Sequence, residues 1–218
     1  EEAASNYQVF LRLRKGLTGH EGNYALMRSG ISIDDLHSTS SALLAGDDPP
    51  EPPSWAHLWS GALALAAVIP VGPRSAVELG CGLGLPGLVA ARRGARVTFV
   101  DREPAALAFV RASVQANALA GATLVAADFT TPVLRPRFDL VLAAEVLYDR
   151  PAFGRVASAL ARHLAPGGRA LLADAGRIDT RAFYDGLDVV GLRWRADDLE
   201  MREEGLPVRV RLVELQHR

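Results

Sequence analysis

The sequence is poor in cysteine and in lysine, and it has no excess of charge of either sign. Cys81 is the only cysteine, and Lys15 is the only lysine among 24 basic residues. A single cysteine excludes an internal disulfide and favours a reducing compartment, so we expect a cytoplasmic protein. A formal net charge of −1 gives no sequence-wide attraction to nucleic acid or to an anionic membrane, and we expect neither as a partner.

Long apolar runs are also missing. The longest uncharged stretch, residues 54–73, is interrupted by His57, Gly61 and Pro70, which makes it a poor membrane span and favours a buried helix. The five histidines show no paired ligand spacing, so no metal site is expected. What is present is 49% hydrophobic residues over 218 positions, which predicts a folded domain with a sizeable core.

A proline-rich connector divides the chain. Four of the five residues at 49–53 are prolines, which are incompatible with a regular helix or a central strand. We therefore expect residues 1–54 to form a separate lid or substrate-recognition segment that ends in this connector. Ser54 is predicted to cap a helix over residues 55–69.

From residue 74 onward, short apolar runs alternate with helical patterns. The predicted strands are 76–79, 96–100, 123–127, 138–144 and 169–173, and the predicted helices begin at Pro104, at Pro151 and near Thr180. Such repeated βα units indicate an α/β protein with a doubly wound, mostly parallel, Rossmann-like sheet whose strands are buried on both faces. Residues 207–214 alternate apolar and charged side chains, which predicts an antiparallel C-terminal edge hairpin.

Three alternate glycines follow the first predicted strand. Gly80, Gly82 and Gly84 stand in Glu78-Leu-Gly-Cys-Gly-Leu-Gly84, between that strand and a helix. The same spacing occurs in ordinary turns. Its place in a βαβ unit favours a nucleotide-like ligand, because side chains there would keep the ligand away from the backbone.

Acidic residues end the next two strands. Asp101 follows Gly84 by 17 residues, where a carboxylate can accept both ribose hydroxyls, although it also fits a helix cap. Asp128 follows the third strand, where it either starts a turn or accepts a hydrogen bond from an adenine amino group. Phe129 is then placed to pack on the adenine ring. Parallel strands end at one edge of a sheet, so these residues predict an adenosine site.

Two cofactors fit an adenosine site of this kind. A dinucleotide fold favours G-x-G-x-x-G with a pyrophosphate at the helix N-terminus. Here the pattern is G-x-G-x-G, and Glu78 before it would repel pyrophosphate but could bind an ammonium group. The ligand with adenosine, an amino acid and no phosphate is S-adenosylmethionine, whose product is S-adenosylhomocysteine. An NAD-linked oxidoreductase would need a proton donor such as a Tyr-x-x-x-Lys pair, and Lys15 offers none.

The glycine loop, the two acids and a Pro-Gly-Gly turn at 166–168 together resemble the seven-strand class I methyltransferases. The resemblance covers residues 55–218, and it implies a seven-stranded sheet and a domain with this activity. Three stretches are similar to the protein-lysine methyltransferase-like branch, which includes enzymes acting on electron transfer flavoprotein: Trp55-Ala-His-Leu-Trp-Ser-Gly61, Gly80-Cys-Gly-Leu-Gly-Leu-Pro-Gly87 and Glu145-Val-Leu-Tyr148. The sequence departs from that branch at Ser60, where proline is common, and at Glu145, where aspartate is common.

This resemblance places Glu145 and Tyr148 beside the transferred methyl group. Glu145 is expected to bind and orient the incoming ammonium, and Tyr148 to line the channel and hydrogen-bond the amine. Trp59 is expected to contact the methionine end of the cofactor. The cofactor-binding set is completed by three neighbours of the motifs: Cys81, Arg102 and Ala144.

The sequence therefore predicts an S-adenosylmethionine-dependent methyltransferase acting on a protein lysine, with a monomer favoured. A small-molecule methyltransferase would use the same cofactor residues. Arginine methylation lacks the expected pair of flanking glutamates, and nucleic-acid amino methylation lacks an Asn/Asp-Pro-Pro-Tyr/Phe motif after strand four. A non-catalytic S-adenosylmethionine-binding module is the alternative of another class.

Overall fold

A computed structural model describes residues 53–132, 134–135, 137–203 and 206–218. The predicted N-terminal segment, residues 1–54, lies almost entirely outside the described residues, and its proposed role as a lid stays a prediction. The rest of the chain, residues 55–218, is described nearly throughout.

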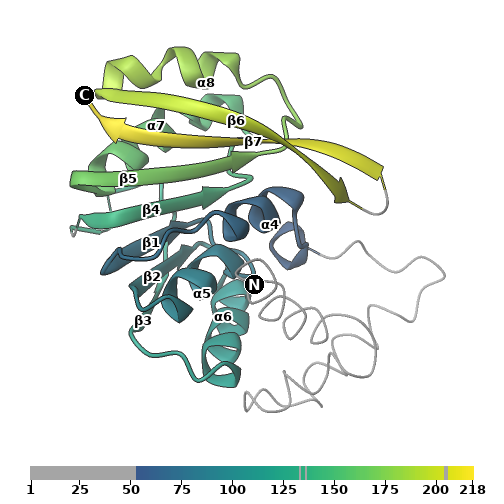
Figure 1. Cartoon of the computed structure of the whole chain (residues 1–218), viewed down its shortest axis with the longest axis vertical. Coiled ribbons are helices and arrows are strands. Elements are labelled where there is room, and N and C mark those ends of the chain that lie inside the picture. Colours follow the sequence, from purple (N-terminus) through teal and green to yellow (C-terminus); the bar gives the residue numbers. More distant parts are fainter. Residues whose placement is uncertain (1–52, 133, 136, 204–205) are drawn as a thin grey trace.

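The described strands form one seven-stranded sheet, as predicted (Figure 1). They are β1 (Ser75–Leu79), β2 (Arg96–Asp101), β3 (Ala122–Ala126), β4 (Phe138–Ala144), β5 (Leu164–Asp174), β6 (Leu192–Glu203) and β7 (Leu206–His217). The spatial order is β3-β2-β1-β4-β5-β7-β6. The first five strands are parallel, and β7 is antiparallel to both of its neighbours. The order therefore reverses at β1, which lies between β2 and β4, and such a switch point is where ligands bind in sheets of this type.

Helices cover both faces of the sheet (Figure 1). In chain order the described helices are η2 (Ser54–Ala56), α4 (Ser60–Ala67), α5 (Leu85–Arg92), α6 (Pro104–Ala116), η3 (Arg150–Ala152), α7 (Phe153–His163), α8 (Arg181–Asp185) and η4 (Leu187–Val190). One apolar cluster joins α4, α5 and α6 to the sheet, and a second joins α7 and α8 to the opposite face. Strand β1 serves both clusters, because Ala76 faces the first while Val77 and Leu79 face the second. This two-sided burial explains the continuous apolar runs of the parallel strands.

The C-terminal hairpin confirms the predicted antiparallel edge, but its inner strand is buried further than the alternation suggested. β6 is the edge strand, and β7 lies between β5 and β6. Val210 packs in the cluster under α4, whereas Val213 and Leu215 pack in the cluster on the other face. The alternating pattern holds where Arg209 and Arg211 are exposed and Val210 between them is buried.

The predicted helix over residues 55–69 is wrong in its first part. Residues Ser54–Ala56 form one 3₁₀ turn, His57 and Trp59 are extended, and the α-helix begins only at Ser60. Ser54 is not its cap; its carbonyl oxygen instead accepts a hydrogen bond from Trp59 Nε1 at 3.0 Å. The Gly61 amide lies in the first turn of α4, where amides have no partner within the helix. It donates a hydrogen bond to the distant Glu145 side chain. A tertiary contact therefore satisfies an amide in the first turn of this helix.

Two further boundaries differ from the sequence prediction. β5 begins at Leu164 rather than at residue 169, so the Pro-Gly-Gly turn lies inside it, at a register irregularity against β4. The predicted helix near residues 180–187 is divided into α8 and the 3₁₀ helix η4, with Gly186 between them. Among the described residues, no helix is long and apolar enough to cross a membrane.

Candidate active site

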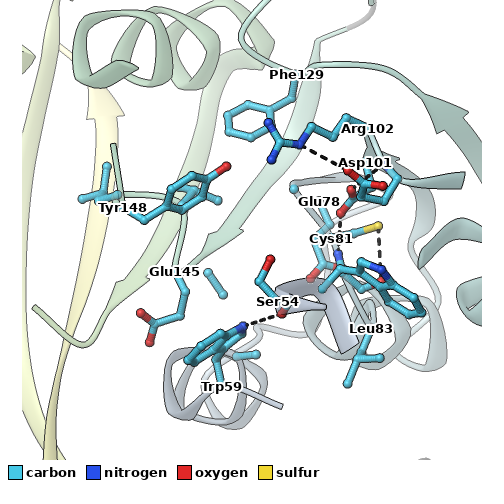
Figure 2. Close-up of a pocket in the computed structure, with 18 of the residues that line it drawn as sticks. Ser54, Trp59, Glu78, Cys81, Leu83, Asp101, Arg102, Phe129, Glu145 and Tyr148 are labelled. Atoms are coloured by element: carbon cyan, nitrogen blue, oxygen red, sulfur yellow. Dashed lines mark hydrogen bonds and ion pairs between the residues drawn. The ribbon is translucent and has the colours of Figure 1, made fainter. Parts of the chain in front are cut away.

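A cavity of about 650 Å³ lies at the C-terminal ends of the parallel strands β1 to β5 (Figure 2). Its size is that of a typical small-molecule site. All of the sequence-predicted site residues line it: Trp59, Glu78, Gly80, Cys81, Gly82, Gly84, Asp101, Arg102, Asp128, Phe129, Ala144, Glu145 and Tyr148. The fold thus brings together residues that are as many as 89 positions apart, from Trp59 to Tyr148. Their individual roles stay predictions.

The glycine loop after β1 adopts a backbone that requires glycine. Gly80, Gly82 and Gly84 have φ values of 64°, 50° and 74°, in the left-handed region that other residues rarely adopt. Space is short as well, because a Cβ atom on Gly84 would lie 2.8 Å from Val110 Cγ2. The loop therefore borders the cavity with three positions that carry no side chain.

Asp101, at the end of β2, fixes this loop. Its Oδ2 accepts a hydrogen bond from the Gly82 amide at 2.7 Å, and its Oδ1 accepts one from the Glu103 amide at 3.0 Å. The carboxylate is thus tied to Glu103, which is the N-cap residue of α6, so Asp101 itself is not the cap, and it lines the cavity. Each carboxylate oxygen has two acceptor positions, so the ribose-binding alternative is compatible with both contacts.

Asp128 and Phe129 follow β3 on the same side of the cavity. Asp128 Oδ1 accepts hydrogen bonds from the amide and the hydroxyl of Thr130, at 2.8 and 2.7 Å, and these bonds hold the pKa of the carboxyl below its ordinary value. Asp128 therefore starts a turn, and it also borders the cavity. Phe129 contacts the position where a Gly80 side chain would begin, which brings its ring against the glycine loop.

Glu78 is the most deeply buried acid of the site, with 2% of its surface exposed. Its Oε2 accepts a hydrogen bond from the Gly87 amide in the first turn of α5, at 2.9 Å. Burial raises its pKa from 4.5 to about 8, and the nearby Asp101 adds to the effect. Glu78 is therefore mostly protonated at neutral pH, and a cation beside it would favour its ionised form. Burial likewise raises the pKa of the adjacent Cys81 thiol, which makes that side chain an inert lining group.

Glu145 lies at the other end of the cavity, directly after β4. It is one of two non-glycine residues with positive φ among the described residues, at 55°. Its Oε1 accepts a hydrogen bond from the Gly61 amide of α4 at 3.0 Å, and its Oε2 accepts one from the Ala175 amide after β5 at 3.3 Å. Burial raises the pKa of this carboxyl above its ordinary range. The strained backbone and the two amide contacts aim the carboxylate at a fixed position between α4 and β5.

Two aromatic side chains, Trp59 and Tyr148, lie on either side of Glu145. Figure 2 shows Trp59 below the carboxylate and Tyr148 above it, with the phenol reaching into the cavity. Tyr148 is 62% exposed, and its predicted role in the acceptor channel stays a prediction. The Trp59 ring lies 4.2 Å from the His57 ring between centroids, and the two rings are tilted by 50°.

Two charged residues of this end were missed in the sequence. Asp174 ends β5 and lines the cavity, and burial raises its pKa. Arg177 follows it, with its Nε 3.6 Å from Glu145 Oε2 and its Cζ 4.3 Å from the centre of the Trp59 ring. Asp174 could have been found by the rule that identified Asp101, because both are acids at the end of a parallel strand. The contacts of Arg177 with Glu145 and Trp59 were not predicted from the sequence.

The described residues contain no group of three or more histidine, cysteine or acidic side chains that could hold a metal ion. The chemistry that this site offers comes from hydrogen bonds, buried carboxylates and aromatic faces. It can bind a nucleoside at the Asp101 end and a cation at the Glu145 end.

Comparison with known proteins gives a consistent result. Residues 77–172 match the family model described as a methyltransferase domain. Over 127 residues the chain is 34% identical to the protein N-lysine methyltransferase METTL21A of Danio rerio, covering 53% of this chain and 57% of that protein. Over 133 residues it is 31% identical to EEF1A lysine methyltransferase 3 of Mus musculus, covering 57% of each. The chain thus spans little more than half the length of these curated relatives.

Solved structures agree on the fold. The N-methyltransferase NodS of Bradyrhizobium japonicum, in complex with S-adenosyl-L-homocysteine, superposes with a TM-score of 0.56. The match covers 83% of this chain and 97% of that one, at 19% sequence identity. The predicted doubly wound, Rossmann-like architecture is confirmed.

Proposed function

We propose that this chain transfers a methyl group from S-adenosylmethionine to the side-chain amine of a protein lysine. The observation that supports this most strongly is the division of one cavity into two ends. Asp101 and the glycine loop form a nucleoside-type end, and Glu145 with its aromatic neighbours forms a cation-type end.

The residues present fit S-adenosylmethionine better than a dinucleotide. The glycine loop leaves room for close approach of a ligand, and Asp101 can accept hydrogen bonds from ribose hydroxyls. Glu78, buried and beside that loop, suits the ammonium of an amino acid, because a cation there would stabilise its ionised form and a pyrophosphate would not. When bound, S-adenosylmethionine supplies a methyl group on a positively charged sulfur.

The acceptor end has the groups needed to position a lysine. A lysine side chain has a reference pKa of about 10.4, so its deprotonation at pH 7 costs about 4.6 kcal/mol. Glu145 does not reduce this cost, because a carboxylate stabilises the ammonium form. It binds and orients the ammonium, the proton leaves to solvent, and the free amine then forms the new N–C bond while the S–C bond breaks. Holding the two reactants in line can contribute about 7–11 kcal/mol to such a step.

A protein acceptor is supported by the names of the curated relatives, and a lysine acceptor by the two buried carboxyls of Glu145 and Asp174 near one another. A small-molecule amine would meet the same two groups. We propose a protein acceptor, a monomeric state and a cytoplasmic location.

Calorimetric titration tests the cofactor directly. S-adenosylmethionine and S-adenosylhomocysteine are expected to bind, and NAD is not. Binding of NAD without binding of S-adenosylmethionine would overturn the proposal.

Labelling of a cell lysate with tritiated S-adenosylmethionine tests the acceptor. The label is expected in protein, at lysine side chains identified by mass spectrometry. Label confined to the small-molecule fraction would support the alternative acceptor, and label at other side chains would contradict lysine.

A further inference from the structure

Arg177 is the one cation that contacts both walls of the acceptor end, as far as the described residues show. Its Nε lies 3.6 Å from Glu145 Oε2, and its Cζ lies 4.3 Å above the Trp59 ring. A carboxylate and an aromatic face are the two groups that recognise an ammonium ion. The guanidinium therefore occupies the place where a cationic acceptor would find its contacts.

Both walls are held in position by groups other than Arg177. The Glu145 carboxylate accepts hydrogen bonds from the Gly61 and Ala175 amides. The Trp59 indole donates a hydrogen bond to the Ser54 carbonyl at 3.0 Å and contacts the tilted His57 ring. Removal of the Arg177 side chain would therefore leave the subsite in place, so anchoring the two walls is not the function of this arginine.

The arginine and its carboxylate partner differ in their exposure to solvent. The Glu145 side chain is only 7% exposed, whereas the Arg177 side chain is 39% exposed. An arginine with this access to water can move away at small cost, but a carboxylate as buried as Glu145 is costly to leave without a positive partner. Departure of Arg177 is thus favourable only when another cation arrives.

We infer that Arg177 is a specificity-determining residue that fills the acceptor-ammonium subsite of the free protein and is displaced by the ammonium of the acceptor. This inference rests on the proposed function, because it names the cation class of that same site. It explains how the site selects amines over neutral acceptors such as alcohols. A neutral group would displace Arg177 without replacing its charge beside Glu145 and Asp174.

Binding of a minimal probe tests the inference without methyl transfer. The probe is Nα-acetyl-lysine methylamide, and its neutral counterpart is Nα-acetyl-norleucine methylamide. Binding is followed through the indole N–H resonance of Trp59, assigned with the Trp59→Phe variant. In Arg177→Gln the lysine probe should bind about three- to thirtyfold tighter than in the wild type, because it no longer competes with an ion pair and a cation–π contact. The norleucine probe should not bind to either protein.

Arg181→Gln is the matched control. Arg181 lies four residues further on and pairs with Asp179 at the surface, so this variant removes one positive charge from the same segment without touching the subsite. It should bind the lysine probe as the wild type does. In the double variant Arg177→Gln with Glu145→Gln, the tighter binding of the lysine probe should be lost.

Three outcomes would overturn the inference: equal or weaker binding of the lysine probe by Arg177→Gln, equal binding of the norleucine probe, or the same gain in Arg181→Gln. None of these measurements uses S-adenosylmethionine. A protein that bound the lysine probe as described but transferred no methyl group would contradict the proposed function alone, so the two failures are distinguishable.

Discussion

The two ends of the cavity are built in different ways. At the Asp101 end, Asp101 and Asp128 accept hydrogen bonds from backbone amides within the first βαβ units. The three residues of the loop after β1 that have a left-handed backbone are all glycines. At the Glu145 end, the left-handed residue is a glutamate, and its contacts come from α4 and from the segment after β5.

This difference has a physical consequence. Glycine adopts the left-handed conformation without steric cost, so the nucleoside end is stable by local geometry. A non-glycine residue in that conformation costs about 1–3 kcal/mol and persists only when its surroundings hold it. The acceptor end therefore depends on tertiary contacts, and changes at the two ends should affect different steps.

The largest expected effect is at the nucleoside end. Asp101→Ala removes a carboxylate that would accept two ribose hydroxyls, and charged hydrogen bonds contribute about 1.5–3 kcal/mol each. S-adenosylmethionine affinity measured by calorimetry should fall by at least about a hundredfold.

Asp139→Ala is the control for this prediction. Asp139 also accepts two backbone amides, those of Arg74 and Ser75, but it does not line the cavity. Its loss should lower the free energy of unfolding and leave the affinity unchanged. A similar loss of affinity in both variants would mean that Asp101 acts only through folding.

Gly84→Ala should destabilise the protein by about 2–5 kcal/mol, the sum of backbone strain and overpacking against Val110. Gly94→Ala is matched to it, because Gly94 also has a positive φ, 94°, but has open space around its Cβ position. This variant should lose only the strain, about 1–2 kcal/mol, in urea unfolding. Equal losses would show that close packing does not constrain the glycine loop.

Glu78 should make stability depend on pH. Its pKa of about 8 in the folded protein exceeds the unfolded value of 4.5, so the folded state binds more protons between these values and stability falls as the pH rises through about 8. Between pH 6 and pH 9 the wild type should lose about 3 kcal/mol relative to Glu78→Gln, measured by urea unfolding without ligand. A difference that stays constant over this range would contradict the buried, protonated state of Glu78.

The smallest effect is expected at Asp128. It is a surface acid whose Oδ1 already bonds Thr130, and a hydrogen bond to an adenine amino group is worth about 1 kcal/mol. Asp128→Ala should lower the affinity for S-adenosylmethionine by about five- to tenfold. The affinity for S-adenosylmethionine analogues that lack the adenine amino group should stay unchanged. Loss of affinity for both ligands would assign Asp128 to the turn alone.

The sequence predicted the nucleoside end better than the acceptor end for reasons visible in the structure. Gly80, Gly82 and Asp101 lie within 22 positions and follow consecutive strands, so a pattern in the chain corresponds to a pattern in space. The sheet was predictable for the same reason, because burial on both faces leaves continuous apolar runs.

The acceptor end could not be predicted to the same extent, because its contacts join distant positions. Gly61 and Glu145 are 84 residues apart, and their contact satisfies an amide in the first turn of α4. Arg177 reaches Glu145 and Trp59 only because β5 lies beside β4 and α4 packs against both. The burial of Glu145 beside Asp174 follows from the same packing.

One paired measurement tests the division of the cavity most directly: calorimetric S-adenosylmethionine affinity and initial rate of tritium transfer to lysate protein, for Asp101→Asn and Glu145→Gln. In Asp101→Asn the affinity should fall by about tenfold or more, while transfer at saturating S-adenosylmethionine stays near that of the wild type. In Glu145→Gln the affinity should stay within about threefold of the wild type, while transfer falls by at least about tenfold. Affinity and transfer falling together in both variants would contradict a cavity with separate cofactor and acceptor ends.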